Sequence, residues 1–136
     1  MVASPATLFA NVRRSDPLGL WSKSGLEYSR VKEFLDFSTA DLAKVAGVSV
    51  QSVRLDGRIP PDLRDRLEQI ANVCALVAEY LDGDPERTAL WFRTPNPMLG
   101  DVSPRDMIRL GRSKRLLKFV LEALAANERG EKKARA

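Results

Sequence analysis

Apolar residues recur at helical spacing along most of the chain, and this pattern predicts an all-α fold. From residue 28 onward, Val31 and Leu35 fall on one face of a first short helix. Ser38 is followed three residues later by Asp41, the arrangement in which each side chain can bond the other residue's backbone amide at a helix start. A second helix is therefore predicted to begin at this point and to end at Gly47.

The middle of the chain predicts a very short helix followed by a long one. Ser49 can cap a third helix over residues 50–54, which Gly57 and the prolines after it would close. Pro61 suits the first turn of a fourth helix, which would run to the turn at residues 82–85. The apolar row of this helix comprises Leu63, Leu67, Ile70, Cys74, Val77 and Leu81.

Three further helices are predicted in the C-terminal half. Residues 86–93 form a short helix, and the Pro-Asn-Pro sequence at residues 95–97 forces a turn after it. Ser103 followed by Pro104 marks another helix start, and Gly111 ends that helix. The last helix starts at Ser113 and carries Leu116, Leu117, Val120, Leu121 and Leu124 on its apolar side. No stretch alternates with a period of two residues, so no strand is expected.

These elements divide the chain into four segments. Residues 1–27 lack sustained periodicity and are expected to form a flexible arm, with Trp21 more often docked on its own protein than on a partner. Residues 28–82 form a first helical region, residues 83–127 a C-terminal helical domain, and residues 128–136 a charged tail.

Composition excludes several classes of function. The chain of 136 residues has no histidine and one cysteine, which removes the usual zinc sites, intrachain disulfides and the commonest general base. Cys74 is expected to be a small buried apolar residue rather than a reactive thiol. The acidic residues are spread over helix starts and faces, so neither an enzyme nor a cofactor site is expected. No secretion signal or membrane-length apolar run is found, which favours a cytoplasmic protein.

Ala43, Gly47 and Val53 indicate a helix-turn-helix, because they are separated by four and then six residues. Such a motif needs a small residue where the helices touch, a residue that tolerates positive φ at the turn, and an apolar residue that packs the second helix. The start of the second helix would face the major groove of DNA. The predicted DNA-binding residues are Lys44, Ser49, Gln51, Ser52, Arg54 and Arg58.

Gln51 and Arg54 are the predicted base-reading residues among these six, because glutamine pairs with the adenine edge and arginine with the guanine edge. The competing interpretation is a pair of helices that never touches DNA and simply carries a solvated polar face. The net charge of +4 is compatible with nucleic acid but does not decide between the two.

The C-terminal half resembles a known family. Trp91, the Pro-Asn turn at Asn96, Leu99 and the Ser103-Pro104 helix start, followed by an apolar helix, resemble the C-terminal domain of Xre/ParS-type (MbcA/ParS/Xre) antitoxins. The resemblance covers roughly residues 29–126. Trp91 is expected to be a large buried anchor, and Asn96 is expected to tie the turn through its own backbone.

The resemblance implies a type II antitoxin of the RES–Xre group. Such antitoxins neutralise NAD-degrading RES-domain toxins by covering the active site, so the NAD chemistry belongs to the partner. The final helix and the tail are the expected toxin-facing part, where Arg112, Lys114, Arg115 and Lys118 add a basic face that could equally contact DNA phosphate. The candidate toxin-binding residues are Arg112, Arg115, Leu116, Phe119, Leu124 and Arg129.

Two other functions remain open at this stage. A stand-alone helix-turn-helix regulator would use the C-terminal half only for dimerisation, whereas an adaptor would not contact DNA. A two-helix DNA reader normally acts as a dimer on a two-fold site, so a homo-oligomer that represses its own operon is expected.

Overall fold

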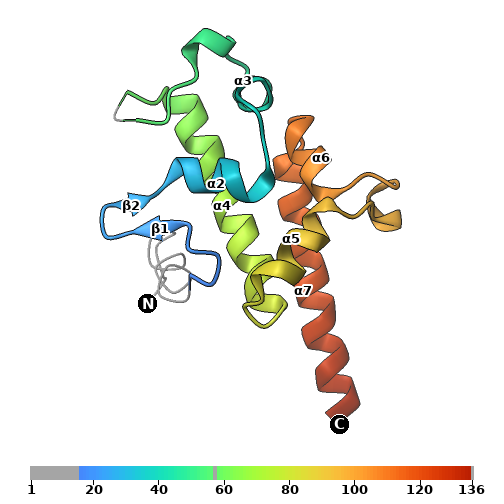
Figure 1. The fold of residues 1–136 in the computed structure, drawn as a ribbon. Coiled ribbons are helices and arrows are strands. Elements are labelled where there is room, and N and C mark those ends of the chain that lie inside the picture. Colours follow the sequence, from blue (N-terminus) through green and yellow to red (C-terminus); the bar gives the residue numbers. More distant parts are fainter. Residues whose placement is uncertain (1–15, 57, 136) are drawn as a thin grey trace, which may run out of the picture.

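The computed structural model describes residues 16–56 and 58–135, with side chains as far as Asn127, and this part of the chain is mostly helical. Figure 1 shows the helices gathered around α4, with α7 projecting beyond the others at its C-terminal end. The described α-helices are α2 (Tyr28–Leu35), α3 (Thr39–Ala46), α4 (Pro61–Tyr80), α5 (Pro85–Arg93), α6 (Pro104–Arg109) and α7 (Ser113–Arg135).

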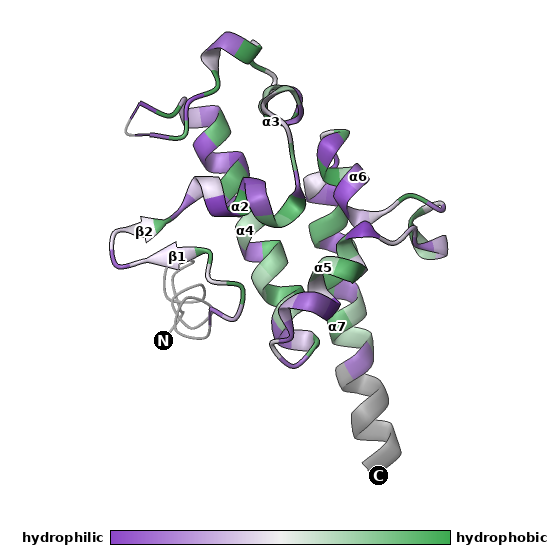
Figure 2. Cartoon of the chain, in the orientation of Figure 1, coloured by the Kyte–Doolittle hydropathy of each residue, from purple (hydrophilic) through white to green (hydrophobic). Residues whose placement is uncertain are grey.

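Helix α4 is the centre of the fold, because α2, α3, α5 and α7 all pack against it. Its buried residues occupy more than one side of the helix, as expected for a helix that is surrounded rather than laid on a surface. Figure 2 shows apolar and polar residues alternating around the helices, so that each can turn an apolar side toward this centre. The expected long fourth helix is confirmed.

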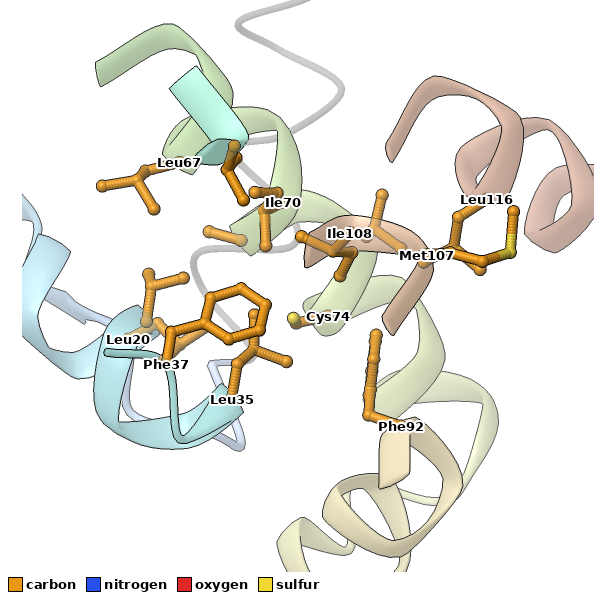
Figure 3. Close-up of a cluster of buried hydrophobic side chains, with 14 of the residues drawn as sticks. Leu20, Leu35, Phe37, Leu67, Ile70, Cys74, Phe92, Met107, Ile108 and Leu116 are labelled. Atoms are coloured by element: carbon orange, nitrogen blue, oxygen red, sulfur yellow. The ribbon is translucent and has the colours of Figure 1, made fainter. Parts of the chain in front are cut away.

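The hydrophobic core joins the two halves of the chain. Figure 3 shows Phe37 and Leu35 on one side of Cys74, and Ile108 and Phe92 on another. All five residues belong to one buried cluster. Cys74 is fully enclosed, and this burial raises the pKa of its thiol. Its predicted role as a small buried apolar residue is confirmed.

Short side chains set the helix starts as the sequence predicts. Ser38 Oγ accepts a hydrogen bond from the Asp41 amide at 3.0 Å, while the Ser38 amide donates to the Asp41 carboxylate at 2.9 Å. Ser103 Oγ likewise accepts from the Asp106 amide at 3.1 Å at the start of α6. Gly47 ends α3 with a φ of 69°, a conformation that most side chains avoid.

A two-stranded hairpin precedes α2 and corrects the expectation that the chain lacks strands. Strands β1 (Trp21–Ser22) and β2 (Gly25–Leu26) pair antiparallel, with Trp21 opposite Leu26. The Asp16 carboxylate accepts from the amides of Leu20 and Trp21, and Leu20 is only 1% exposed. Residues 16–27 are therefore packed on the core rather than arranged as a loose arm, and Trp21 docks on its own protein as expected.

Arg105 ties the C-terminal half to the end of α2. Its Nε donates to the Leu35 carbonyl oxygen at 2.5 Å, and its Nη2 donates to the Asp36 carbonyl oxygen at 2.6 Å. The guanidinium also lies 5.3 Å from the centre of the Phe37 ring. One side chain of α6 thus caps α2 across the fold and satisfies carbonyl groups that a helix end leaves without partners.

Replacing Arg105 is predicted to destabilise the whole fold. Arg105→Ala should lower the free energy of unfolding by about 2–3 kcal/mol, because two hydrogen bonds to a charged donor are lost and a carbonyl group is left unpaired. Arg105→Lys should restore less than half of the loss, since an ammonium group lacks the planar fork. The matched control is Arg87→Ala, which removes an exposed ion pair and should change stability by less than about 0.5 kcal/mol in urea unfolding. Equal losses for both alanine variants would contradict the role of Arg105.

The capping box predicts an acid-dependent contribution to stability. Hydrogen bonds from the Ser38 backbone, then from its side chain, hold the pKa of Asp41 below its ordinary value of 3.8, against the opposing effect of burial. Because the folded pKa is the lower one, this contribution is present above about pH 4 and is lost as pH falls through the folded pKa. Asp41→Asn should cost about 1 kcal/mol near neutral pH and progressively less in acid, as measured by urea unfolding at several pH values. A cost that does not change with pH would contradict this assignment.

Candidate functional site

The six predicted DNA-binding residues lie together on one exposed segment that starts at α3. Lys44 is exposed on α3, and the other five are exposed between residues 49 and 58. The chain leaves α3 through Gly47, where Ala43 is buried and Val53 packs against the core. The three residues that indicated a helix-turn-helix therefore occupy the expected kinds of position.

The second helix of this motif is not formed, which corrects the prediction over residues 50–54. The segment contains only η1, a 3₁₀ turn at Val50–Ser52, and Val53 after it is extended. Ser49 does not cap a backbone amide; its hydroxyl lies 2.7 Å from that of Ser52. Serines that bond each other and two β-branched valines leave too little to offset the cost of nucleating a helix this short.

Helix α7 is fixed to the core at its start. Ser113 is buried, and its hydroxyl donates to the Gln69 side-chain oxygen of α4 at 3.2 Å. Leu116 and Val120 then enter the core, with exposed fractions of 0% and 4%. Leu121 is 50% exposed, which differs from the apolar side predicted for it. Beyond this point the helix extends past the other elements (Figure 1).

One side of α7 borders a hollow with a basic rim, called here the basic hollow. Its volume is about 530 Å³, and Arg112, Arg115 and Lys118 of α7 line it. Among the described residues, neither Arg112 nor Arg115 makes an ion pair, whereas Lys118 lies 4.0 Å from Glu122. The rest of the lining is largely apolar, with Met98, Leu99, Val102, Met107 and Phe119. Cations beside apolar side chains can attract an acidic partner and cover one of its apolar side chains.

The residues before α6 shape the other wall of the basic hollow. Asn96 Oδ1 accepts from the Met98 amide at 2.9 Å, as the sequence predicted, and holds the 3₁₀ turn η2 (Pro97–Leu99) in place. Met98 projects from this turn and is 78% exposed. Sequence reasoning did not select Met98, since a single methionine in a turn carries no periodic signal.

A second hollow, called here the apolar groove, lies between the end of α4, α5 and α7. Its volume is about 140 Å³, and no charged residue lines it. Tyr80 and Leu81 form one wall, Trp91 another, and Phe119, Val120, Ala123 and Leu124 of α7 the third. Tyr80 is 50% exposed at its edge.

Trp91 lines this groove and is only partly buried, which corrects its expected role as a large buried anchor. Phe92 takes that role instead, with 1% exposure. The Phe92 ring packs edge-on against Trp91 at 5.0 Å and against Phe34 of α2 at 6.0 Å. Adjacent aromatic residues on a helix face different directions, and the sequence alone did not indicate which one pointed inward.

The structure separates the candidate toxin-binding residues. Arg112 and Arg115 line the basic hollow, Leu124 lines the apolar groove, and Phe119 lines both. Leu116 is fully buried, so it belongs to the core and cannot contact a partner in the folded protein. The side chain of Arg129 lies outside the described residues, as do the side chains of the tail that follows it. The predicted toxin contact of Arg129 therefore stays a prediction.

Neither a metal centre nor a membrane span is found in the described part of the chain. No group of three or more His, Cys, Asp or Glu residues is placed to hold a metal ion among the residues searched. No described helix is long and apolar enough to cross a membrane.

Comparison with known proteins shows that the region containing both hollows matches a known family of domains. Residues 75–126 match the family model described as the antitoxin Xre/MbcA/ParS C-terminal toxin-binding domain. The chain is 29% identical to the mycobacterial cidal antitoxin MbcA of Mycobacterium bovis and of Mycobacterium tuberculosis over 110 residues, which cover 81% of this chain and 89% of each relative. A solved structure, the M. tuberculosis MbcT-MbcA toxin-antitoxin complex, matches with a TM-score of 0.50 and 26% identity over 74% of this chain and 92% of the matched chain.

The matched segment starts at Ala75 in the second half of α4 and ends near the last described side chain of α7. It therefore includes every residue that lines the apolar groove and the basic hollow. The chain is therefore similar to the antitoxin MbcA over most of its length, and its residues 75–126 match the antitoxin Xre/MbcA/ParS C-terminal toxin-binding domain.

Proposed function

We propose that this protein is the antitoxin of an MbcT–MbcA-type pair, that it neutralises a RES-domain, NAD-degrading toxin by covering its active site, and that it represses its own operon. The observation that carries the toxin-binding part is the placement of the basic hollow within the segment that matches a toxin-binding domain. The similarity to a chain of a solved toxin-antitoxin complex supports the same conclusion.

The basic hollow is the proposed contact with the toxin. Arg112 and Arg115 are exposed and have no ionic partner among the described residues, so an acidic toxin surface would gain charge pairs without breaking existing ones. Met98 and Phe119 supply apolar area beside these cations, and apolar contacts at the centre of an interface carry most of its affinity.

Covering the active site is a physical block, and it requires no reactive group on the antitoxin. The C-terminal end of α7 suits this role, because the helix extends beyond the body while the buried residues Ser113, Leu116 and Val120 hold its start on the core. A helix anchored at one end loses little additional conformational freedom when its other end is bound. The NAD chemistry then resides entirely in the partner.

DNA binding is the second part of the proposal. The support for it is the exposed segment after Gly47, which carries Gln51, Arg54 and Arg58 beside Lys44 of α3. This segment has a turn where a helix-turn-helix requires one, but it does not present a helix to the major groove. Its phosphate contacts would make DNA affinity strongly dependent on salt. A dimer would place two such segments on a two-fold operator.

A stand-alone transcriptional regulator is the alternative function. The same DNA-binding segment supports it, with the C-terminal half serving only for dimerisation. Co-expression with the neighbouring gene product, followed by pull-down, distinguishes the two, since a regulator without a toxin would recover no partner.

Charge reversal at the basic hollow tests the toxin contact. Arg112→Glu combined with Arg115→Glu should weaken binding to the purified toxin by at least about tenfold at physiological salt, because attraction to acidic groups becomes repulsion. Affinity should also lose its dependence on ionic strength when measured by biolayer interferometry. The matched control reverses Lys23 and Arg87, two exposed cations away from the hollow, and should bind normally. Unchanged affinity in the Arg112 and Arg115 variant would remove this surface from the interface.

The DNA-binding segment is tested separately in a gel-shift assay. Gln51→Ala combined with Arg54→Ala should abolish binding to the operon's own promoter DNA, because both predicted base contacts are lost. These side chains are exposed, so the fold should be unaffected and the variant should still bind toxin. Arg87→Ala is the control and should shift DNA as the unmodified protein does. Retained DNA binding by the double variant would exclude this segment as the reader.

A further inference from the structure

Helices α4 and α7 lie side by side and run in the same direction (Figure 1). Near the start of α7, the Ser113 hydroxyl donates to the Gln69 side chain at 3.2 Å. Further along, Tyr80 and Leu124 border the same groove. Both pairs are separated by 44 positions in the sequence, so the two helices keep one register between these points. Together they form a surface that is wider than a single helix.

One side of α7 borders neither of the two hollows. Lys114, Leu117 and Leu121 follow one another at spacings of three and four residues, so they share a side of the helix. None of the three lines the basic hollow or the apolar groove. Leu117 is partly buried against the core, and Leu121 is 50% exposed. An apolar row that begins with an exposed lysine therefore lies outside the proposed toxin contact.

The outer side of α4 continues this surface and is acidic. Leu76 is partly buried against the core, and the exposed residues Asp65, Glu68 and Glu79 recur near it at helical spacings. Asp65 lies 3.6 Å from Arg64, but both side chains are largely exposed, so this pair holds its partners weakly. Neither Glu68 nor Glu79 makes an ion pair among the described residues. The surface thus has an acidic margin on α4, leucines in the middle, and a basic margin on α7.

This order of margins is self-complementary about one two-fold axis. An axis that lies in the contact plane and runs along the helices exchanges the two margins, so the basic margin of one copy meets the acidic margin of the other. An axis across the helices would instead place acid against acid. The first rotation leaves heights along the helices unchanged. Lys114 directly follows Ser113, and Glu68 directly precedes Gln69, so Lys114 and the partner's Glu68 would lie within about 3 Å in height.

We propose that a second copy of this chain packs on this surface, called here the α4–α7 face and defined by Glu68, Leu76, Lys114, Leu117 and Leu121. The face is about 20 Å long and about 20 Å wide, so both copies together contribute about 800 Å² before side-chain relief is counted. This area is at the low end for specific interfaces and belongs to a reversible dimer. The inference rests on the dimer in the proposed function and deepens it by naming the face that forms it.

The dimer leaves both hollows open, because no residue that defines the α4–α7 face lines either of them. A toxin could therefore bind each copy without separating the two. The two exposed segments after α3 would be related by the same two-fold axis, as reading a two-fold operator requires.

Sedimentation velocity of the full chain, without toxin or DNA, tests the proposal at concentrations from about 1 to about 100 μM. The unmodified chain should change from monomer to dimer over this range. Leu121→Glu should weaken self-association at least about tenfold, because it places a charge in the apolar middle of the interface. The matched control is Leu90→Glu, since Leu90 is 66% exposed on α5 and lies outside the face. An unmodified chain that stays monomeric, or equal weakening by both variants, would overturn the proposal.

Charge reversal tests the assigned axis. Lys114→Glu should weaken the dimer about fivefold, because it would then face the partner's acidic margin. Adding Glu68→Lys to the same chain should restore most of the association, since each contact across the axis again joins opposite charges. Circular dichroism checks that the fold of both variants is retained. Failure of the second substitution to restore association would overturn the pairing of these two margins.

Toxin binding distinguishes this inference from the proposed function. Leu121→Glu should bind the purified toxin with unchanged affinity, because Leu121 lies outside both hollows. Loss of toxin binding with retained self-association would assign this face to the toxin and overturn the proposal. An unmodified chain that binds toxin but remains monomeric would overturn the α4–α7 face alone and leave the proposed toxin contact standing.

Discussion

The burial of α4 is the constraint on which the rest of this structure depends. Nine of its 20 residues are buried, among them Leu67 and Ile70 in its first half and Cys74 and Val77 in its second. The helices on either side of it in the sequence therefore pack on one continuous core. A close-packed interior resists rearrangement, so elements that pack on the same core cannot easily move independently. The core therefore fixes where α3, which leads into the exposed segment, lies relative to the two hollows beside α7. Arg105 strengthens that relation by bonding the end of α2 from α6.

The helices themselves were predictable, because their signals are local. Ser38 with Asp41, and Ser103 with Pro104, define helix starts through atoms three residues apart, and both caps form as predicted. The apolar row of α4 likewise needs only its own spacing to be recognised. The C-terminal domain was identified from a pattern of turns and helix starts rather than from any single motif. The matched family confirms that identification.

The features that escaped prediction depend on contacts distant in sequence or on very short segments. Strands of two residues cannot show alternation, and the hairpin is fixed instead by the Asp16 carboxylate and by burial of Leu20. Residues 50–54 are too few for a helix without partners. Phe92 rather than Trp91 faces inward because α2 supplies Phe34 on that side. Leu116 and Leu121 both belong to the apolar row predicted for α7, yet Leu116 is buried and Leu121 is half exposed. The difference depends on which part of α7 packs against α4, and the sequence of α7 alone does not give this.

The boundary of the matched family segment falls at Ala75, in the interior of a continuous helix. Exchange between related genes at that boundary would join the first half of one α4 to the second half of another, although both halves share a single packed interior. Ser113 also reaches back across the boundary to Gln69. Recombination that retains a folded product therefore has to carry most of α4 with it, and this part of the protein should be inherited as a larger unit than its recognisable sequence signature.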